Sequence, residues 1–160
     1  AKLNRANIRT IISPKISSFI VKDLCTVAID SINILIIEDE ATSRTLLRAM
    51  LKSIGLTSVF ESESAEDASK ILSQEAIDLI LCDWMLPGSS GLDLFNTLRN
   101  DNATANIPFV MVSGQSEKAK VIEAIKSGVD GYILKPFSVG GIRNKLQPVI
   151  AGIIKTRSSH

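Results

Sequence analysis

The sequence predicts an α/β fold in which five parallel strands form one sheet with helices on both faces. Short apolar runs alternate five times with segments whose apolar residues recur at helical spacing. The connections between these elements are short, which favours strand–helix–strand crossovers and parallel pairing. The chain has 160 residues, 45% of them hydrophobic and 22% charged, which fits about one globular domain.

The first strand–helix pair shows both patterns. Residues 33–37 read NILII, a β-branched run suited to a strand buried on both faces. Residues 42–54 follow with apolar side chains on one helical face and basic side chains on the other. Gly55 predicts the end of this helix through a left-handed cap. The basic stripe of Arg44, Arg48 and Lys52 is expected to be a solvated face.

The other four pairs repeat this alternation, and Gly128 is expected to end the fourth helix. The expected strands are 57–60, 78–82, 108–112 and 131–134; the expected helices are 64–73, about 90–100, 117–127 and one from about 138 onward. Pro148 costs about 3 kcal/mol inside a helix. We therefore expect a kink or break near Gln147.

Composition excludes several functions. The net charge of +1 argues against nonspecific nucleic-acid binding as the main task. The only histidine is His160, and Cys25 and Cys82 are too few for a zinc site or a disulfide framework. No apolar run is long enough to span a membrane, and residues 1–30 lack the compact apolar core and small-residue cleavage site that a secretory signal would have. A reduced, cytoplasmic setting is expected.

Residues 1–30 form an N-terminal extension before a domain expected at 31–155, with a short tail at 156–160. The extension is the basic part of the chain, with five Lys/Arg against two Asp. An amphipathic helix is expected over about 14–28, with an apolar stripe of Ile16, Phe19, Ile20, Leu24 and Val27. It is expected to pack on its own domain, to link to an upstream domain, or to form a homodimer. Membrane-surface binding is least favoured, because acidic residues dilute its basic face.

Polar residues stand where the predicted strands end. Glu38 and Asp39 follow the first strand, Asp83 the third, Ser113 the fourth and Lys135 the fifth. In an open parallel sheet, ligands gather beyond the carboxyl ends of the strands. The fold is therefore expected to bring three acids, a hydroxyl and an amine to one edge.

These residue types suit magnesium and phosphate. Clustered carboxylates repel one another unless a cation neutralises them, and their hard oxygens suit Mg²⁺. Asp39 and Asp83 are expected to ligate it, with Glu38 acting through water. Lys135 and Ser113 would bind phosphoryl oxygens while Asp83 attacks as the nucleophile, forming an acyl phosphate.

Residues 33–150 resemble the receiver domain of two-component response regulators, close to the single-domain chemotaxis type. The segments that carry the resemblance are IIEDE (36–40), CDWMLPGSSG (82–91), MVSG (111–114) and YILKPF (132–137). Asp39, Asp83, Ser113 and Lys135 are separated by 44, 30 and 22 residues, which are typical intervals in the family. The resemblance implies a flavodoxin-like doubly wound sheet with strand order 2-1-3-4-5.

The resemblance also implies residue roles. Asp83 would be the phosphoacceptor, and Glu38 and Asp39 the acidic pair at the metal. Met85 would give a backbone carbonyl to Mg²⁺, and the Lys135–Pro136 peptide bond would be cis. Ser113 and Tyr132 would act as the switch pair, and Asp83, Lys135 and Ser113 would carry out the phosphoryl chemistry.

The implied function is that of a phosphorelay receiver rather than a metabolic enzyme. It would take a phosphoryl group from a sensor histidine kinase or a histidine phosphotransfer protein and then bind a downstream target protein, without contacting nucleic acid or inserting into a membrane. In the family, phosphorylation remodels the face made by the fourth helix, the fifth strand and the fifth helix. The first helix commonly contacts the kinase in the family, so the resemblance gives Arg44, Arg48 and Lys52 a docking role as the alternative to a solvated face. The chain would catalyse only its own phosphorylation and dephosphorylation.

Simpler interpretations exist for single residues. Asp39 or Asp83 could cap a helix, Ser113 could be an ordinary strand-end hydroxyl, and Tyr132 could merely pack in the core. A haloacid dehalogenase-type hydrolase would need a second acid where Met85 stands. A dinucleotide-binding protein would need a glycine-rich loop after the first strand, where EDEAT stands instead.

Overall fold

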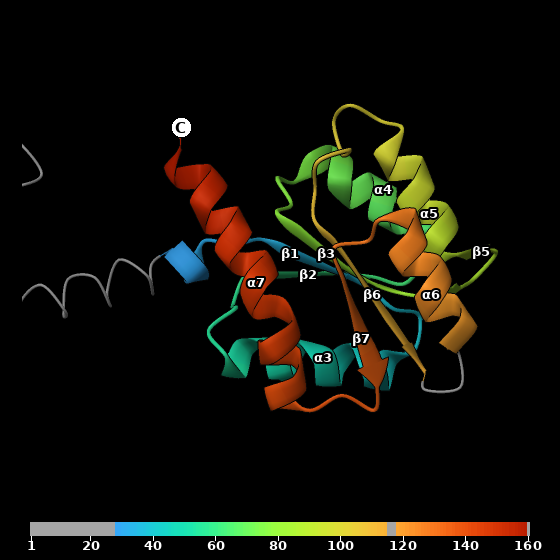
Figure 1. Cartoon of the computed structure of the whole chain (residues 1–160), viewed down its shortest axis with the longest axis horizontal. Helices are drawn as coiled ribbons and strands as arrows, with labels where there is room; N and C mark the ends of the chain where they lie inside the picture. The colour runs from blue at the N-terminus through green and yellow to red at the C-terminus, as the bar shows by residue number, and fades with distance from the viewer. Residues whose placement is uncertain (1–27, 115–117, 160) are drawn as a thin grey trace, which may run out of the picture.

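A five-stranded parallel sheet forms the centre of the computed structural model, which describes residues 28–114 and 118–159 (Figure 1). Its strands are β1 (Ile34–Ile37), β2 (Val59–Ser62), β3 (Leu79–Asp83), β6 (Phe109–Gly114) and β7 (Gly131–Lys135). They lie in the order β2-β1-β3-β6-β7, and every neighbouring pair is parallel. The predicted order 2-1-3-4-5 is thus confirmed.

Helices cover both faces of this sheet (Figure 1). One layer contains α4 (Ala65–Gln74), α5 (Gly91–Arg99) and α6 (Lys118–Ser127), and the other contains α3 (Ala41–Ser53) and α7 (Val139–Ser158). Because successive side chains of a strand point to opposite faces, each strand supplies both layers. In β3, Ile80 and Cys82 pack toward the first layer, while Leu79 and Leu81 pack toward the second.

Local sequence sets the ends of the helices. Ile54 is the C-cap of α3 and Gly55 follows at φ +94°; Gly128 follows α6 at φ +91°. Both predicted glycine stops are therefore confirmed, because this left-handed backbone is costly for residues that carry a Cβ. At the other end of α3, the Glu40 side chain accepts hydrogen bonds from the backbone N–H groups of Thr42 and Ser43.

Two features differ from the expected elements. A short antiparallel hairpin, β4 (Met85–Leu86) with β5 (Ser89–Ser90), follows β3 and was not predicted, because two-residue strands carry no periodic pattern. The helix α7 is not broken near Gln147 but continues through Pro148 to Ser158. Ile142, Leu146 and Ile153 are buried on both sides of the proline, and each is worth about 1.5–3 kcal/mol, which offsets the cost of Pro148.

The predicted N-terminal helix falls almost wholly outside the described residues. The part that is described, residues 28–30, is helical and lies beside the C-terminal end of α7 (Figure 1). Within the described ranges, no helix is both long and apolar enough to cross a membrane.

Candidate functional site

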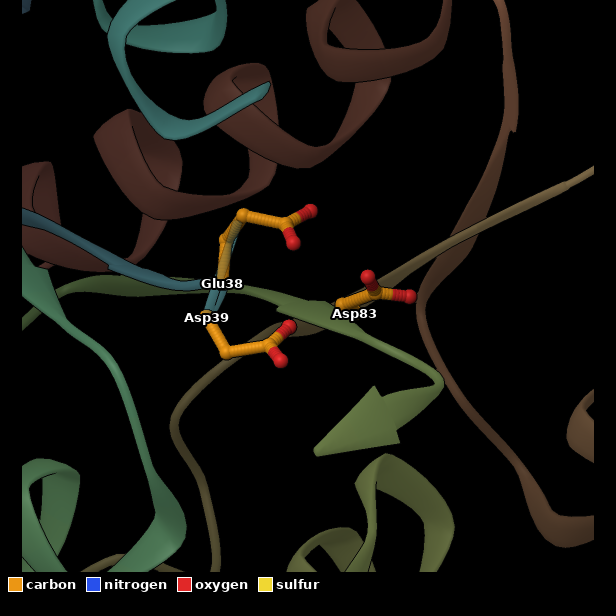
Figure 2. A group of neighbouring side chains, drawn as sticks. All are labelled: Glu38, Asp39 and Asp83. Carbon is orange, nitrogen blue, oxygen red and sulfur yellow. The ribbon is translucent and has the colours of Figure 1, made fainter. Parts of the chain in front are cut away.

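The site begins with the acids that follow β1 and β3. These two strands are hydrogen-bonded neighbours, with Ile37 paired to Cys82, so Glu38 and Asp39 leave the sheet beside Asp83. Figure 2 shows the three carboxylates converging at the ends of their strands. One carboxylate oxygen of each acid lies within 4.8 Å of the others. The three acids that the sequence predicted to lie together are therefore neighbours in the structure.

Lys135 joins two of these acids. Its ammonium, carried in from the end of β7, donates a hydrogen bond of 2.6 Å to Glu38 Oε2 and one of 2.9 Å to Asp83 Oδ2. The Glu38 side chain is 4% exposed and the Asp83 side chain 11% exposed, so little water screens these ion pairs. The peptide bond from Lys135 to Pro136 is cis, as expected.

Burial and charge set the protonation of this network. Desolvation raises the pKa of Glu38 above its usual value of 4.5 and is only partly offset by the hydrogen bond from Lys135. Burial lowers the pKa of Lys135, but its hydrogen bonds to Glu38 and Asp83 outweigh that effect and leave the pKa raised. The lysine therefore stays an ammonium at neutral pH and is the cation fixed between the two acids.

The donor set fits a hard divalent cation. Three carboxylates face one ammonium, so negative charge remains uncompensated after Lys135 is counted. Both oxygens of Glu38 already have donors, because Oε1 accepts from the N–H of Glu40 at 3.1 Å. The exposed Asp39 carboxylate accepts no hydrogen bond from any residue in the described ranges. Asp39 and Asp83 are therefore better placed than Glu38 to ligate a metal directly.

Neither acid has the simpler role of a helix cap. Glu40, not Asp39, caps α3, and Ser90, not Asp83, caps α5. Asp83 instead ends β3, and its Oδ1 accepts from the Met85 N–H at 3.3 Å.

The hydroxyl and the aromatic residue lie on the neighbouring strands. Ser113 follows Val112, the β6 residue paired with Asp83, and is 1% exposed. Tyr132 lies on β7 in register with Met111 and is 8% exposed within the apolar cluster of the α4–α6 layer. The fold thus brings Ser113 to the correct edge of the sheet and places Tyr132 mostly inside.

The structure adds two residues that sequence reasoning did not assign to the site. The Arg44 guanidinium donates to the Glu38 carbonyl at 2.7 Å and pairs with Glu63 at 2.9 Å. Arg44 therefore supports the end of β1, and the expectation of a solvated side chain is wrong for this member of the stripe, which is 15% exposed. Glu63, directly after the neighbouring strand β2, was the feature of the sequence that could have predicted a partner for Arg44.

Lys120 is the second addition. Its ammonium lies 3.6 Å from Met85 Sδ and 5.5 Å from the centroid of the Trp84 ring, so α6 contacts the two residues after Asp83. Met85 itself is 60% exposed, whereas Trp84 is buried. No sequence motif predicted that Lys120 would contact Trp84 and Met85, because these contacts depend on how α6 packs against the sheet.

Comparison with known proteins agrees with this geometry. Residues 34–147 match the family model of the response regulator receiver domain. The chain is 31% identical to the chemotaxis protein CheY of Pseudomonas aeruginosa, over 72% of this chain and 94% of that protein. It is 30% identical to the chemotaxis protein CheY-3 of Vibrio cholerae, over 74% of this chain and 92% of that protein.

Among solved structures, a response regulator receiver protein from Pseudomonas putida superposes with a TM-score of 0.66. The two are 28% identical, and the match covers 73% of this chain and 96% of that one. The family match, the relatives and the strand order agree, so the chain belongs to the receiver-domain family of two-component response regulators.

Proposed function

We propose that this receiver accepts a phosphoryl group on Asp83 in the presence of Mg²⁺ and signals by changing the proteins it binds. The observation that carries the proposal is Lys135, whose ammonium joins Asp83 and Glu38 within a cluster of three carboxylates. A nucleophilic carboxylate, a fixed cation and an acidic cation site are the parts that phosphoryl transfer needs. A receiver-like module that never accepts phosphate usually lacks one of the acids or the lysine, and this chain has all of them.

In the proposed reaction, an Asp83 carboxylate oxygen attacks the phosphorus of a phosphohistidine on a sensor kinase or phosphotransfer protein. A P–O bond forms as the P–N bond breaks, and the leaving imidazole takes up a proton. The product is an acyl phosphate on Asp83 and a free histidine on the donor.

The surrounding residues stabilise the charge on the transferred group. Lys135 is already within hydrogen-bond distance of Asp83 and needs only a small movement to contact a phosphoryl oxygen. Ser113, at the same edge of the sheet, would donate its hydroxyl to another. Asp39, Asp83 and the Met85 carbonyl would hold Mg²⁺, with Glu38 acting through water; the metal would supply positive charge for phosphoryl oxygens.

The proposed output surface lies on α6, β7 and α7. Ile122, Ile125 and Leu134 are large apolar side chains exposed there by 46–64%. Exposed apolar groups of this size are typical of protein-binding surfaces. Movement of Ser113 toward the phosphoryl group, followed by Tyr132 on the adjacent strand, would alter this surface for a downstream protein.

The test is intact-mass measurement after incubation with a small phosphodonor. The wild-type chain should gain one phosphoryl group with Mg²⁺ and much less after chelation. Asp83→Asn should gain none, while Asp101→Asn, an exposed acid outside the cluster, should behave as wild type. Full labelling of Asp83→Asn would overturn the assignment.

A further inference from the structure

The edge of the sheet opposite Asp83 carries a groove that the receiver chemistry does not use. Its volume is about 590 Å³, within the range of about 300–1,000 Å³ typical of ligand pockets. It lies between the last turns of α7 and the segments that enter β3, β6 and β7. Apolar side chains form much of the lining, among them Ile77, Ile107, Pro108, Val149 and Ile153.

The N-terminal part of the chain enters the fold at the mouth of this groove. Arg157, which lines it, donates to the Ser31 hydroxyl at 2.9 Å and pairs with Asp78 at 2.7 Å. Asp78 also lines the groove and accepts from the Asn33 N–H at 2.8 Å. Ile29 packs against the buried cluster to which Ile153 belongs. Residues 29–33 are therefore fixed beside the groove. The preceding N-terminal segment is attached to the fold at this place.

The preceding sequence has a matching apolar stripe. Residues 1–27 lie outside the described part of the chain, and Ile16, Phe19, Ile20, Leu24 and Val27 recur there at helical spacing. A helix from Ile16 to Val27 is about 16 Å long at about 1.5 Å per residue. The α7 wall of the groove, from Pro148 to Arg157, runs for about 13 Å on the same scale.

We propose that this groove is the docking site for the N-terminal segment of the same chain, with Leu24 and Val27 inserted near Arg157. The attachment of Ser31 to Arg157 favours the chain's own segment over a second copy. A tethered segment has an effective concentration in the millimolar range, which a free copy does not reach. Docking there would leave the edge with Asp83 open to a phosphodonor.

Cysteine cross-linking in the full chain tests the proposal. The test variant carries Leu24→Cys and Gly152→Cys, with Cys25→Ser to remove the neighbouring thiol. Each new thiol is then about 8–10 Å along its helix from the Ser31–Arg157 contact. Gly152 lines the groove, and a Cβ built on it meets nothing within 4 Å, so the substitution fits. Cys82 is buried, and desolvation raises the pKa of its thiol, which keeps it out of the reaction.

With an added mild oxidant such as oxidised glutathione, which takes up the two electrons and two protons of the thiols, an intramolecular disulfide should form rapidly in this variant. Gly140→Cys is the matched control, because Gly140 is also exposed in α7 with open space around its Cβ but lies outside the groove. Gly152→Cys with the native Cys25 is a second control, since Cys25 lies on the opposite face of the expected helix. Equal cross-linking in the controls, or disulfide-linked dimers, would overturn the proposal.

A second measurement covers the case in which Leu24→Cys disturbs folding. In the Cys25→Ser chain, a bulky maleimide should modify Gly152→Cys about tenfold more slowly than Gly140→Cys, because the docked segment covers the first position. Leu24→Asp should abolish the difference. Equal rates with Leu24 intact would show that the groove is open and the proposal is wrong.

Discussion

Lys135 is the residue on which the proposed phosphoryl transfer depends most. Its ammonium contacts two acids, and both contacts are largely shielded from water. Removing it takes away the fixed cation that would stabilise charge on the transferred phosphoryl group. Such groups typically contribute about 10²–10³-fold to rate.

Lys135→Ala should therefore slow phosphorylation of Asp83 by about 100-fold or more while leaving Mg²⁺ binding intact or stronger. Metal binding should survive because the variant has lost a positive charge beside the acids. Stopped-flow measurement with a small phosphodonor checks the rate, and Lys126→Ala, an exposed lysine of α6, serves as the control. Loss of metal binding together with the rate would assign Lys135 a structural role instead.

Asp39 differs from Glu38 in having a carboxylate open to solvent. Trp84, the only tryptophan, is buried directly after Asp83 and reports on this edge of the sheet. Asp39→Ala should raise the Kd for Mg²⁺ by more than about tenfold, which corresponds to about 1.4 kcal/mol of binding free energy. Quenching of Trp84 fluorescence on titration with Mg²⁺ measures this Kd. Glu61→Gln removes a nearby acid that pairs with Arg48 and should change little. Unchanged quenching in Asp39→Ala would exclude Asp39 as a principal ligand.

At the scale of elements, α5 depends on a reciprocal cap. The Ser90 side chain accepts from the Asp93 N–H at 3.1 Å, and Asp93 Oδ2 accepts from the Ser90 N–H at 3.1 Å. The Ser90 hydroxyl, and then its backbone N–H, lower the pKa of Asp93 from its usual value of 3.8. A lowered pKa means that the ionised carboxylate stabilises the fold above that value and loses this effect as the pH falls.

Ser90→Ala should lower the free energy of unfolding by about 1 kcal/mol at pH 7. The deficit should shrink below about pH 4, as Asp93 becomes protonated in the wild-type chain. Chemical denaturation at several pH values measures it, and Ser73→Ala, an exposed serine late in α4, is the control. A deficit that stays constant down to pH 2 would mean that the ionised Asp93 has no part in the cap.

Gly91 links α5 to Asp83, the proposed phosphoacceptor. Its N–H donates to the Trp84 carbonyl at 2.7 Å, and a Cβ at this position would collide with the Asp83 carbonyl oxygen. Gly91→Ala should cost about 1–3 kcal/mol of stability and slow phosphorylation, because the end of β3 must shift. Gly88→Ala, where a Cβ meets nothing but φ is +75°, separates backbone strain from this collision. Equal phosphorylation rates in wild type and Gly91→Ala would contradict the close-packing argument.

The elements that the sequence predicted well are those with a complete pattern. Predicting the strand Ile34–Ile37 and the end of α3 at Gly55 needed only local information. Apolar β-branched residues favour a buried strand, and glycine favours a left-handed cap. The hairpin β4–β5 and the course of α7 needed tertiary information. The first is too short to show a period, and the second continues through Pro148 with buried contacts on both sides.

At the scale of the whole molecule, parallel pairing brings the ends of four strands, β1, β3, β6 and β7, together at one candidate site. Glu38 and Lys135 are 97 residues apart in sequence yet hydrogen-bonded at 2.6 Å. Residue type at the strand ends was enough to predict this, because the carboxyl ends of parallel strands share one edge. The contacts of Arg44 and Lys120 could not be predicted in the same way, because they depend on how each helix is placed against the sheet.

The central claim is that Asp83 itself carries the phosphoryl group, and chemical trapping tests it most directly. The wild-type chain is phosphorylated by a small phosphodonor with Mg²⁺ and reduced with borohydride, which converts an aspartyl phosphate into homoserine. Peptide mass spectrometry should then find homoserine at position 83 and nowhere else. Reduction at position 39, or phosphate that survives on a serine such as Ser113, would contradict the account.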